Sequence, residues 1–248
     1  MGALSLVLVC RQANAAQTNS VAPATPEAAA EWALSLDNNA RMQALQGVLN
    51  GWAQTDPAAA AVWSKKLGTQ DSWATATIVS TWGHKDPKAA ADWVKTLPEG
   101  EKRAQALEVL GLAWGSKRSE EALGWANQLQ TEPDRQSALG GVLNSWAMQN
   151  SDAALRYAEK QGDPKLQEHL LGKVIQGWCF QDRAGAEKWV KELPEGSLKN
   201  TLQKVISSAP VIRRRVVPVP PANSGEARKK ISLNFERLLY LERNQKFL

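Results

Sequence analysis

The sequence contains few of the residues from which disulfide frameworks, metal sites and nucleophilic active sites are built. It has two cysteines and two histidines in 248 residues, and Cys10 lies in a segment with a signal-peptide pattern. A disulfide framework is therefore not expected, and no zinc spacing, phosphate-binding glycine loop or G-x-S-x-G turn is present. No apolar run reaches the roughly 18 residues of a membrane span. The sequence predicts a fold held by side-chain packing, with no cofactor, no metal and no transmembrane span.

A strong charge of one sign is also missing from most of the chain. The formal net charge is +5, but residues 211–248 alone hold nine Lys or Arg and three Asp or Glu. Residues 1–210 hold 21 basic and 22 acidic side chains, so this part is nearly neutral. Nucleic-acid-binding proteins usually carry a basic patch, and we expect no nucleic-acid partner for residues 25–209.

Phenylalanine and tyrosine are scarce, whereas tryptophan is abundant and regularly spaced. The chain has three Phe, two Tyr and eleven Trp. Most of the tryptophans fall into two series. The first series recurs at steps of 30, 32, 32 and 32 residues and comprises Trp52, Trp82, Trp114, Trp146 and Trp178. From Trp63 on, each member of the second series stands 11 residues after a member of the first; the second series comprises Trp32, Trp63, Trp93, Trp125, Tyr157 and Trp189. A period near 32 with two anchors per unit is typical of a stacked helical array.

Each unit is predicted to begin with a short helix that carries the second-series aromatic residue. Thr25, Asp56 and Asp86 each precede a proline, which is the pattern of an N-cap followed by the first helical residue. The later first helices lack the proline, and their expected caps are Ser119, Ser151 and Asp182. Proline and glycine in residues 97–100 and 193–196 (both Leu-Pro-Glu-Gly) are expected to end the helix and turn the chain.

The second helix of each unit is predicted from an apolar stripe that ends in a first-series Trp. Counted from Arg135, apolar residues stand at +3, +4, +7, +8 and +11: Ala138, Leu139, Val142, Leu143 and Trp146. Arg41 and Gln167 begin the same pattern, which is a 3.6-residue period facing a core. The fold class expected is therefore all-α, a right-handed α-solenoid of about six αα-hairpins over residues 25–209.

In unit length and layout the chain resembles the tetratricopeptide-like superfamily of helical-hairpin solenoids, without that family's own consensus. Its units read W-x3-D-P-x5-W-x3-L, as in Trp52 to Leu67 and Trp82 to Leu97. This is more similar to uncharacterised bacterial repeat proteins built on a W…DP.AA..W…LP.G unit, many of which carry export signals. The resemblance covers residues 25–209 and implies an architecture but no activity.

The two ends of the chain depart from the repeat. Residues 1–24 combine a short apolar stretch with Ala13-Asn14-Ala15, an A-x-A cleavage pattern, and a flexible linker. Export to the periplasm or medium is the favoured interpretation, and a disordered leader on a cytoplasmic protein is the alternative. Pro210 stands where the sixth first-series Trp is due, and residues 210–248 are basic and proline-containing. This tail is either a natural C-terminus with a terminal helix or the product of a lost reading frame.

The residues that usually carry catalysis have simpler explanations here. His84 falls in an inter-unit turn and His169 within a second helix, where a solvated or half-buried side chain is the expected role. Cys179 follows Trp178 and is expected to pack near a helix end, because the sequence places no histidine beside it. A closed toroid of αα-hairpins with paired carboxylates, as in some glycosidases, is a minor alternative.

The favoured function is a non-enzymatic scaffold that binds a protein or peptide. The polar residues that follow each first-helix aromatic differ from unit to unit, while the apolar and aromatic pattern around them is constant. Such variation suits a partner surface. The residues are Lys65, Lys66, Lys95, Asn127, Gln128, Glu159, Lys191 and Glu192. The alternative is a cell-envelope carbohydrate-binding module that stacks sugars on exposed Trp. The aromatic residues of both series are expected to be structural anchors between hairpins, because each shares a face with Ala, Leu or Val.

Overall fold

The computed structural model describes residues 24–70 and 72–210, and this part of the chain is all-α, as the sequence predicts. It contains ten α-helices, one 3-10 helix and no strand. The chain divides into two units, Met1–Pro210 and Val211–Leu248, and every described residue belongs to the first. The predicted leader (apart from Ala24) and the predicted basic tail and terminal helix (apart from Pro210) lie outside the described residues.

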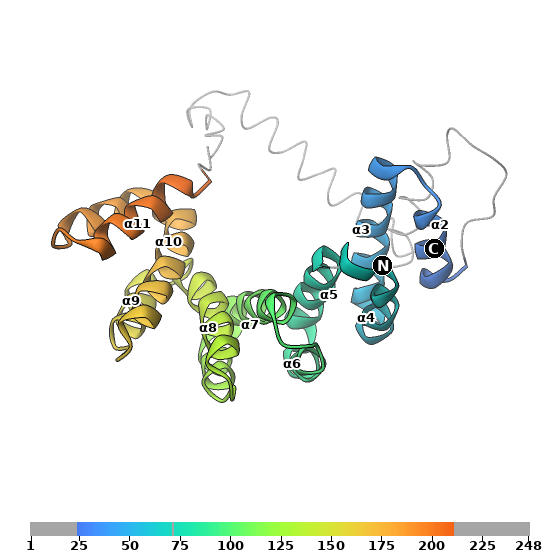
Figure 1. Cartoon of the computed structure of the whole chain (residues 1–248), viewed down its shortest axis with the longest axis horizontal. Helices are drawn as coiled ribbons and strands as arrows, with labels where there is room; N and C mark the ends of the chain where they lie inside the picture. The colour runs from blue at the N-terminus through green and yellow to red at the C-terminus, as the bar shows by residue number, and fades with distance from the viewer. Residues whose placement is uncertain (1–23, 71, 211–248) are drawn as a thin grey trace, which may run out of the picture. The chain divides into compact units, whose positions relative to one another are not determined.

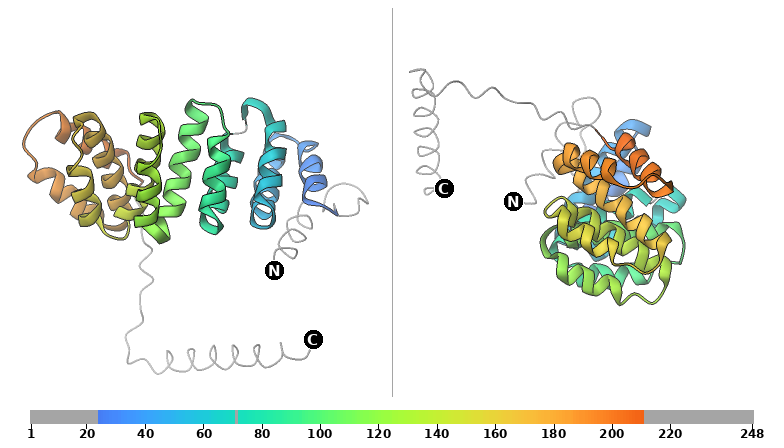
Figure 2. Two further views of the ribbon diagram at one scale, coloured as in Figure 1. Left: turned by 90° about the horizontal axis from the view of Figure 1, so that it is seen from below. Right: turned by 90° about the vertical axis from the view of Figure 1, so that its left-hand side faces the viewer.

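The helices lie side by side in chain order, as Figure 1 and the left view of Figure 2 show. The main contacts join each helix to the next helix along the chain or to the next but one. The elements are α2 (Pro26–Leu34), α3 (Asn38–Thr55), α4 (Pro57–Ser64), the 3-10 helix η1 (Lys65–Gln70), α5 (Ser72–Lys85), α6 (Pro87–Lys95), α7 (Glu101–Asn127), α8 (Glu132–Ala147), α9 (Ser151–Glu159), α10 (Pro164–Glu192) and α11 (Ser197–Ser208).

Side-chain caps begin several helices where the sequence predicts them. The side chains of Thr25, Asp56 and Asp86 accept hydrogen bonds from backbone N–H groups three residues on, at 3.0–3.1 Å. Asp182 accepts in the same way from Gly185, at 3.0 Å. Each cap satisfies one of the N–H groups that the first helical turn leaves without a partner.

Two of the predicted caps are wrong by one residue. Asn150 rather than Ser151 caps α9, because Asn150 has φ −150° and ψ 85° and its side chain reaches the Ala153 N–H at 3.0 Å. Ser151 is already the first helical residue. Ser119 likewise follows the non-helical residue Arg118, so the capping position there holds a side chain that cannot accept a hydrogen bond.

The long helices α7 and α10 each consist of two helical segments that meet at one non-helical residue. Arg118 in α7 has φ −142° and ψ 61°, and Asp182 in α10 has φ −144° and ψ 87°. Asp56 (−140°, 82°) and Asp86 (−141°, 83°) have nearly the same backbone where two separate helices meet. The same bend therefore joins consecutive helical segments at all four places.

The core consists of small and branched residues in the registers that the sequence pattern indicates. Three positions before each second-series aromatic the residue is an alanine with 0% exposure: Ala29, Ala60, Ala90, Ala122, Ala154 and Ala186. The second helices add residues such as Leu49, Val79, Leu143 and Ile175, each 0% exposed. The absence of a longer side chain at the alanine positions lets a neighbouring helix pack closely.

Aromatic rings of the two series lie next to each other. The ring centroids of Trp114 and Trp125 are 5.2 Å apart in a stacked arrangement. Three further pairs, at 6.1–6.4 Å, are Trp52–Trp63, Trp82–Trp93 and Trp146–Tyr157. The 11-residue offset between the series thus brings one ring from each of two neighbouring helical segments into contact across the bend that joins them.

Hydrogen bonds between helices join residues about one sequence period apart. Asn144 donates to Gln176 at 3.1 Å, 32 positions later, and Trp63 donates to Glu31 at 2.9 Å, 32 positions earlier. The ion pair of Arg103 with Asp134, at 2.5 Å, spans 31 positions. Residues with equivalent places in the sequence pattern therefore lie close together in space.

Helices α7, α8 and α10 approach one another through glycine. A Cβ added to Gly141 of α8 would lie 1.9 Å from the Glu108 carbonyl oxygen of α7. A Cβ on Gly177 of α10 would lie 2.0 Å from the Asn144 carbonyl oxygen of α8. Only glycine leaves room for backbone at these two positions.

Candidate functional site

A groove with a volume of about 1060 Å³ lies on α3, α5 and α7. We call it the amide groove, because seven of its twelve lining residues carry a carboxamide or hydroxyl group. The lining residues are Gln43, Gln46, Gly47, Asn50, Ala76, Thr77, Ser80, Thr81, Gln105, Glu108, Val109 and Leu112.

All lining residues except Thr81 occupy a repeated register, nine, six, five or two residues before a first-series Trp. In α3 these positions are Gln43, Gln46, Gly47 and Asn50. The sequence analysis did not predict this register, because it assigned partner binding to the variable polar positions at the ends of the first helices. A detectable signal existed: the positions flank the apolar stripe of each second helix, yet in α3 and α5 none of them is charged.

The amide side chains of this register are partly held by their neighbours. Asn50 Oδ1 lies 3.1 Å from the Thr81 hydroxyl of α5, and Gln105 donates to Glu101 at 3.0 Å. Gln43 and Gln46 form no side-chain hydrogen bond with any residue in 24–70 and 72–210. The groove therefore presents carboxamides whose donors and acceptors are available to a ligand.

A second groove, of about 590 Å³, lies on α10 and α11, and we call it the His169 groove. His169 and Lys173 line it from α10, and Val205 and Ser208 line it from α11. Lys173 forms an ion pair with Glu108, which lines the amide groove. This ion pair marks the boundary between the two grooves.

Two groups of α10 have shifted pKa values. Burial lowers the pKa of His169 below its ordinary value, the charge of Lys173 lowers it further, and Glu108 partly opposes the shift. Burial raises the pKa of the Cys179 thiol, against the opposing charge of Arg183. A raised pKa disfavours the thiolate, so Cys179 lacks the activation of a nucleophilic cysteine.

The polar residues that the sequence suggested for partner binding are all exposed, but none of them lines the amide groove or the His169 groove. Several are engaged with neighbours: Lys66 with Glu27 and Glu31 (3.6 and 2.8 Å), Lys95 with Asp92 (3.1 Å) and Asn127 with Tyr157 (3.0 Å). Lys191 lines a third groove of about 560 Å³, on α10 and α11. The remaining four residues of the set are exposed and line none of the three grooves: Lys65, Gln128, Glu159 and Glu192.

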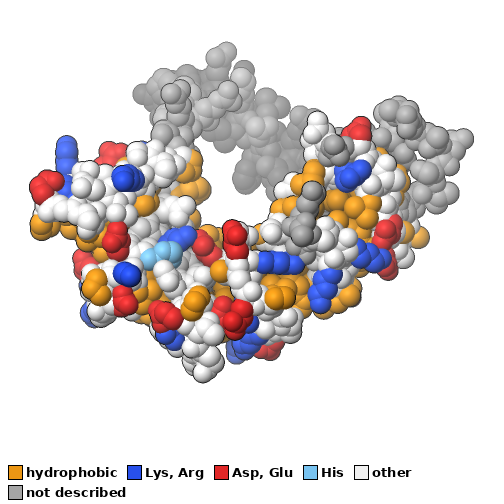
Figure 3. Space-filling view, viewed as in Figure 1, with side chains coloured by type: hydrophobic (Ala, Val, Ile, Leu, Met, Phe, Trp, Pro, Cys, Tyr) orange, Lys and Arg blue, Asp and Glu red, His pale blue; other side chains and the backbone are white. Residues whose placement is uncertain are grey.

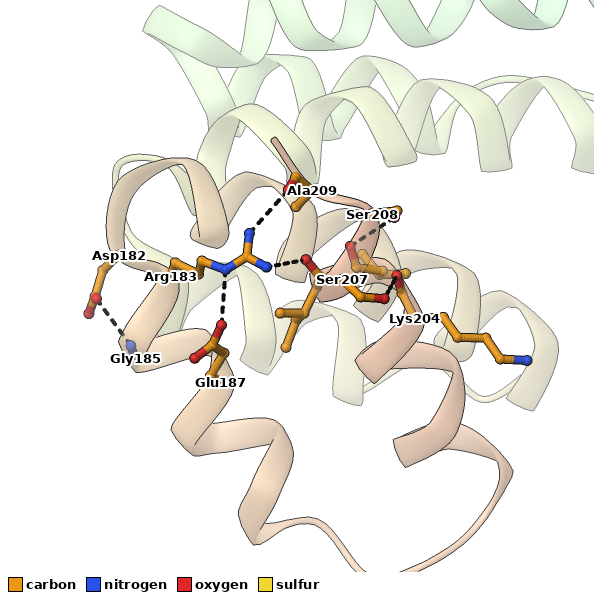
Figure 4. A network of polar contacts seen from close by, with 10 residues as sticks. Asp182, Arg183, Gly185, Glu187, Lys204, Ser207, Ser208 and Ala209 are labelled. Atoms are coloured by element: carbon orange, nitrogen blue, oxygen red, sulfur yellow. Dashed lines mark hydrogen bonds and ion pairs between the residues drawn. The ribbon is translucent and has the colours of Figure 1, made fainter. Parts of the chain in front are cut away.

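The third groove contains a polar network centred on Arg183 (Figure 4). The Arg183 guanidinium donates to the carbonyl oxygens of Ile206 (2.7 Å) and Ala209 (3.1 Å) and pairs with Glu187 (2.9 Å). The first bond adds a second donor to the Ile206 carbonyl, which also accepts from the Ala209 N–H at 3.2 Å, and the second bond pairs the carbonyl of Ala209, the residue that follows α11. We interpret this network as a cap for the end of α11.

None of the eleven tryptophans, all of which lie in the described residues, is exposed. Trp52, Trp63, Trp82 and Trp114 are buried at 3–8% exposure, and the other indoles are half-buried against the core. Tyr157 is half-buried too and pairs with Asn127. Figure 3 shows acidic and basic side chains interspersed with uncharged and apolar surface on the face turned to the viewer.

Comparison with known proteins gives no match to a protein-family model, to a curated protein or to a solved structure. The described residues are thus defined by their fold, an all-α arrangement of ten α-helices packed against their neighbours. No helix within residues 24–70 and 72–210 combines the length and the apolar character needed to cross a bilayer. The same residues contain no group of three or more His, Cys, Asp or Glu that could hold a metal ion.

Proposed function

We propose that the protein is a right-handed α-solenoid of six αα-hairpins that binds a protein or peptide without catalysing a reaction. The observation that carries this proposal is the amide groove, whose lining comes from one repeated register on three neighbouring helices. A repeated register on stacked helices gives an extended binding surface. The A-x-A pattern at Ala13-Asn14-Ala15 adds export to the proposal.

The solenoid is supported by three features of the described residues. The same backbone bend recurs at Asp56, Asp86, Arg118 and Asp182. Inter-helix hydrogen bonds span about one period, and each helix contacts close neighbours in the chain. Paired catalytic carboxylates would favour the toroid enzyme instead, but each of the three described grooves is lined by a single carboxylate: Glu108, Glu168 or Glu187.

Binding to the groove is tested by site-specific photo-crosslinking in the full chain. A photoreactive amino acid replaces Gln46 in the amide groove or, as the matched control, Val62 of α4, which is 65% exposed and lines none of the three grooves. We expect a discrete protein adduct from an envelope extract at position 46 and not at position 62. Identical adducts at both positions, or none at position 46, would refute the proposal.

The carbohydrate alternative is tested by tryptophan fluorescence. Because no indole is exposed in the described residues, we expect blue-shifted emission, weak quenching by iodide and no response to added glycans. Strong quenching that glycans relieve would favour the sugar-binding function.

A further inference from the structure

The last hairpin among the described residues differs from the others in what packs against it. We call it the terminal hairpin; it consists of residues 183–192 of α10 together with α11, and it carries the third groove. Helix α8 packs against α7 before it and against α10 after it, whereas the main contacts of α11 are with α10 alone. Positions that the next helix covers elsewhere are therefore open to comparison on α11.

One such position lies three residues before a first-series Trp. In α7 it is Gly111, where an added Cβ would lie 2.3 Å from the Ala138 carbonyl oxygen of the following helix α8. In α11 it is Ser207, three residues before position 210, and Ser207 is exposed. The other second helices have apolar residues here, each 0% exposed: Leu49, Val79, Leu143 and Ile175.

A second position, seven residues before the first-series Trp, changes in the same way. In α11 it is Gln203, which is exposed. In the five preceding second helices the residue is leucine four times and threonine once, each 1–2% exposed: Leu45, Thr75, Leu107, Leu139 and Leu171.

A third position lies two residues before the second-series aromatic. In the terminal hairpin it is Glu187, whose side chain is 53% exposed and pairs with Arg183. The five preceding first helices have alanine or leucine there, each 0–9% exposed: Ala30, Ala61, Ala91, Leu123 and Leu155.

The three substituted positions meet on one surface, because Glu187, Gln203 and Ser207 all line the third groove. A further helix packed on this groove would remove a carboxylate, an amide and a hydroxyl from water. The terminal repeats of a helical array need such a polar outer face, because no neighbour covers it.

We infer that Glu187, Gln203 and Ser207 make the terminal hairpin the closing unit of the array and keep its outer face from pairing with a second copy of this chain. Pairing of this face with the first hairpin of another copy would be a head-to-tail contact, which can continue into filaments. The inference rests on the proposed function, because it requires the solenoid arrangement proposed there.

The test is analytical ultracentrifugation of the full chain in which Glu187→Ala, Gln203→Leu and Ser207→Leu restore the residue types of the inner hairpins. The control combines Gln54→Leu, Gln128→Leu and Glu159→Ala, which make three exposed positions outside the three grooves apolar. We expect the first variant to associate at a concentration at least about tenfold lower than the control or the unaltered chain.

A pair of single variants tests the two ends of the comparison. Leu171→Gln places at a covered position the residue that α11 has, and we expect it to lower the Tm by about 5 °C or more. Gln203→Leu, at the equivalent open position, should leave the Tm nearly unchanged. Circular dichroism melting measures both.

The outcomes separate this inference from the proposed function. Association of the triple variant no stronger than that of its control, or a loss of Tm for Gln203→Leu as large as that for Leu171→Gln, overturns the inference alone. An unchanged Tm for Leu171→Gln would mean that the next hairpin does not cover this position, and the proposed solenoid would fail together with the inference. The crosslink at position 46 tests partner binding independently of either result.

Discussion

Lys173 of α10 forms an ion pair with Glu108 of α7, a residue 65 positions earlier in the chain. The contact passes over α8, where a Cβ on Gly140 would lie 3.3 Å from Lys173 Cγ and 3.3 Å from His169 Nε2. Side chains two periods apart meet here because the surface of α8 between them is glycine. The pair also separates the amide groove from the His169 groove.

The close approach of α7 and α8 predicts a large loss of stability for Gly141→Ala. The new Cβ would lie 1.9 Å from the Glu108 carbonyl oxygen and 2.8 Å from the Leu112 backbone nitrogen, and neither atom can move alone. We expect a loss of about 3 kcal/mol or more, at the upper end of overpacking costs. Urea unfolding followed by circular dichroism measures it.

Gly124→Ala is the matched control for this variant. Gly124 lies in α7 with no atom within 4 Å of an added Cβ, and its φ is not positive. Alanine there should stabilise the helix by about 0.5–1 kcal/mol. Equal losses for the two variants would contradict the packing between α7 and α8.

The bend at Arg118 predicts that Arg118→Asp stabilises the protein. Its backbone matches that of Asp56 and Asp86, which cap the helices that follow them. A carboxylate at position 118 should add about 1 kcal/mol, whereas the exposed Arg118–Glu121 pair at 3.6 Å contributes little. Thermal unfolding should show a higher Tm for Arg118→Asp and a lower one for Asp86→Ala.

The ion pair of Arg103 with Asp134 predicts a large effect for Asp134→Asn. The side chains are 16% and 9% exposed, and Arg103 Nε has no partner in the described residues. Removal of the carboxylate charge leaves a guanidinium in a mostly buried site, at a cost of about 3 kcal/mol. Denaturant unfolding measures this cost. Asp92→Asn, which removes the exposed partner of Lys95, should change little.

His169 predicts a loss of stability at acid pH. The folded state holds the pKa of His169 below its ordinary value near 6.5, so the unfolded chain binds this proton more readily. The free energy of unfolding should therefore fall as the pH drops from about 7 through the folded-state pKa. NMR titration of the imidazole checks the pKa directly.

Substitution tests the contribution of His169 to this pH dependence. His169→Gln should flatten the slope of stability between about pH 7 and the folded-state pKa of His169. A normal or raised pKa for His169 would contradict its burial beside Lys173.

The network in Figure 4 predicts that Arg183→Ala loosens α11. The variant loses the two hydrogen bonds to the carbonyl groups of Ile206 and Ala209, at about 1 kcal/mol for each. Hydrogen exchange should show faster exchange in α11, with α3 unchanged. Glu187→Gln removes a charge but retains both carbonyl contacts, so protection of α11 should largely persist.

The sequence predicts the all-α class and the helix-starting residues because these depend on local patterns. The tryptophan spacing, the buried alanines and the Asp-Pro caps are all readable within one period of the chain. The sequence pattern places two caps at Ser119 and Ser151, one position after Arg118 and Asn150, because serine is itself a good capping residue.

The candidate site was harder to predict than the fold. Lys65, Lys95 and Glu192 stand at positions that vary on a constant frame, which indicates a partner surface, but solvent-exposed residues vary in the same way. The register of Gln43, Gln46 and Asn50 flanks the apolar stripe of α3 in the sequence, but only the structure shows which neighbouring helices complete the groove. The contact of Glu108 with Lys173 depends on the close packing of α7, α8 and α10, which no local pattern encodes.

The short sequence distance between interacting helices has a kinetic consequence. Bonds such as Asn144–Gln176 close chain segments of only about 32 residues, and the entropy lost on closing such a segment is modest and similar from one helix pair to the next. Proteins dominated by such near-neighbour contacts fold within microseconds to milliseconds. Refolding in a stopped-flow instrument should therefore be fast, and nucleation is not confined to one stretch of the molecule.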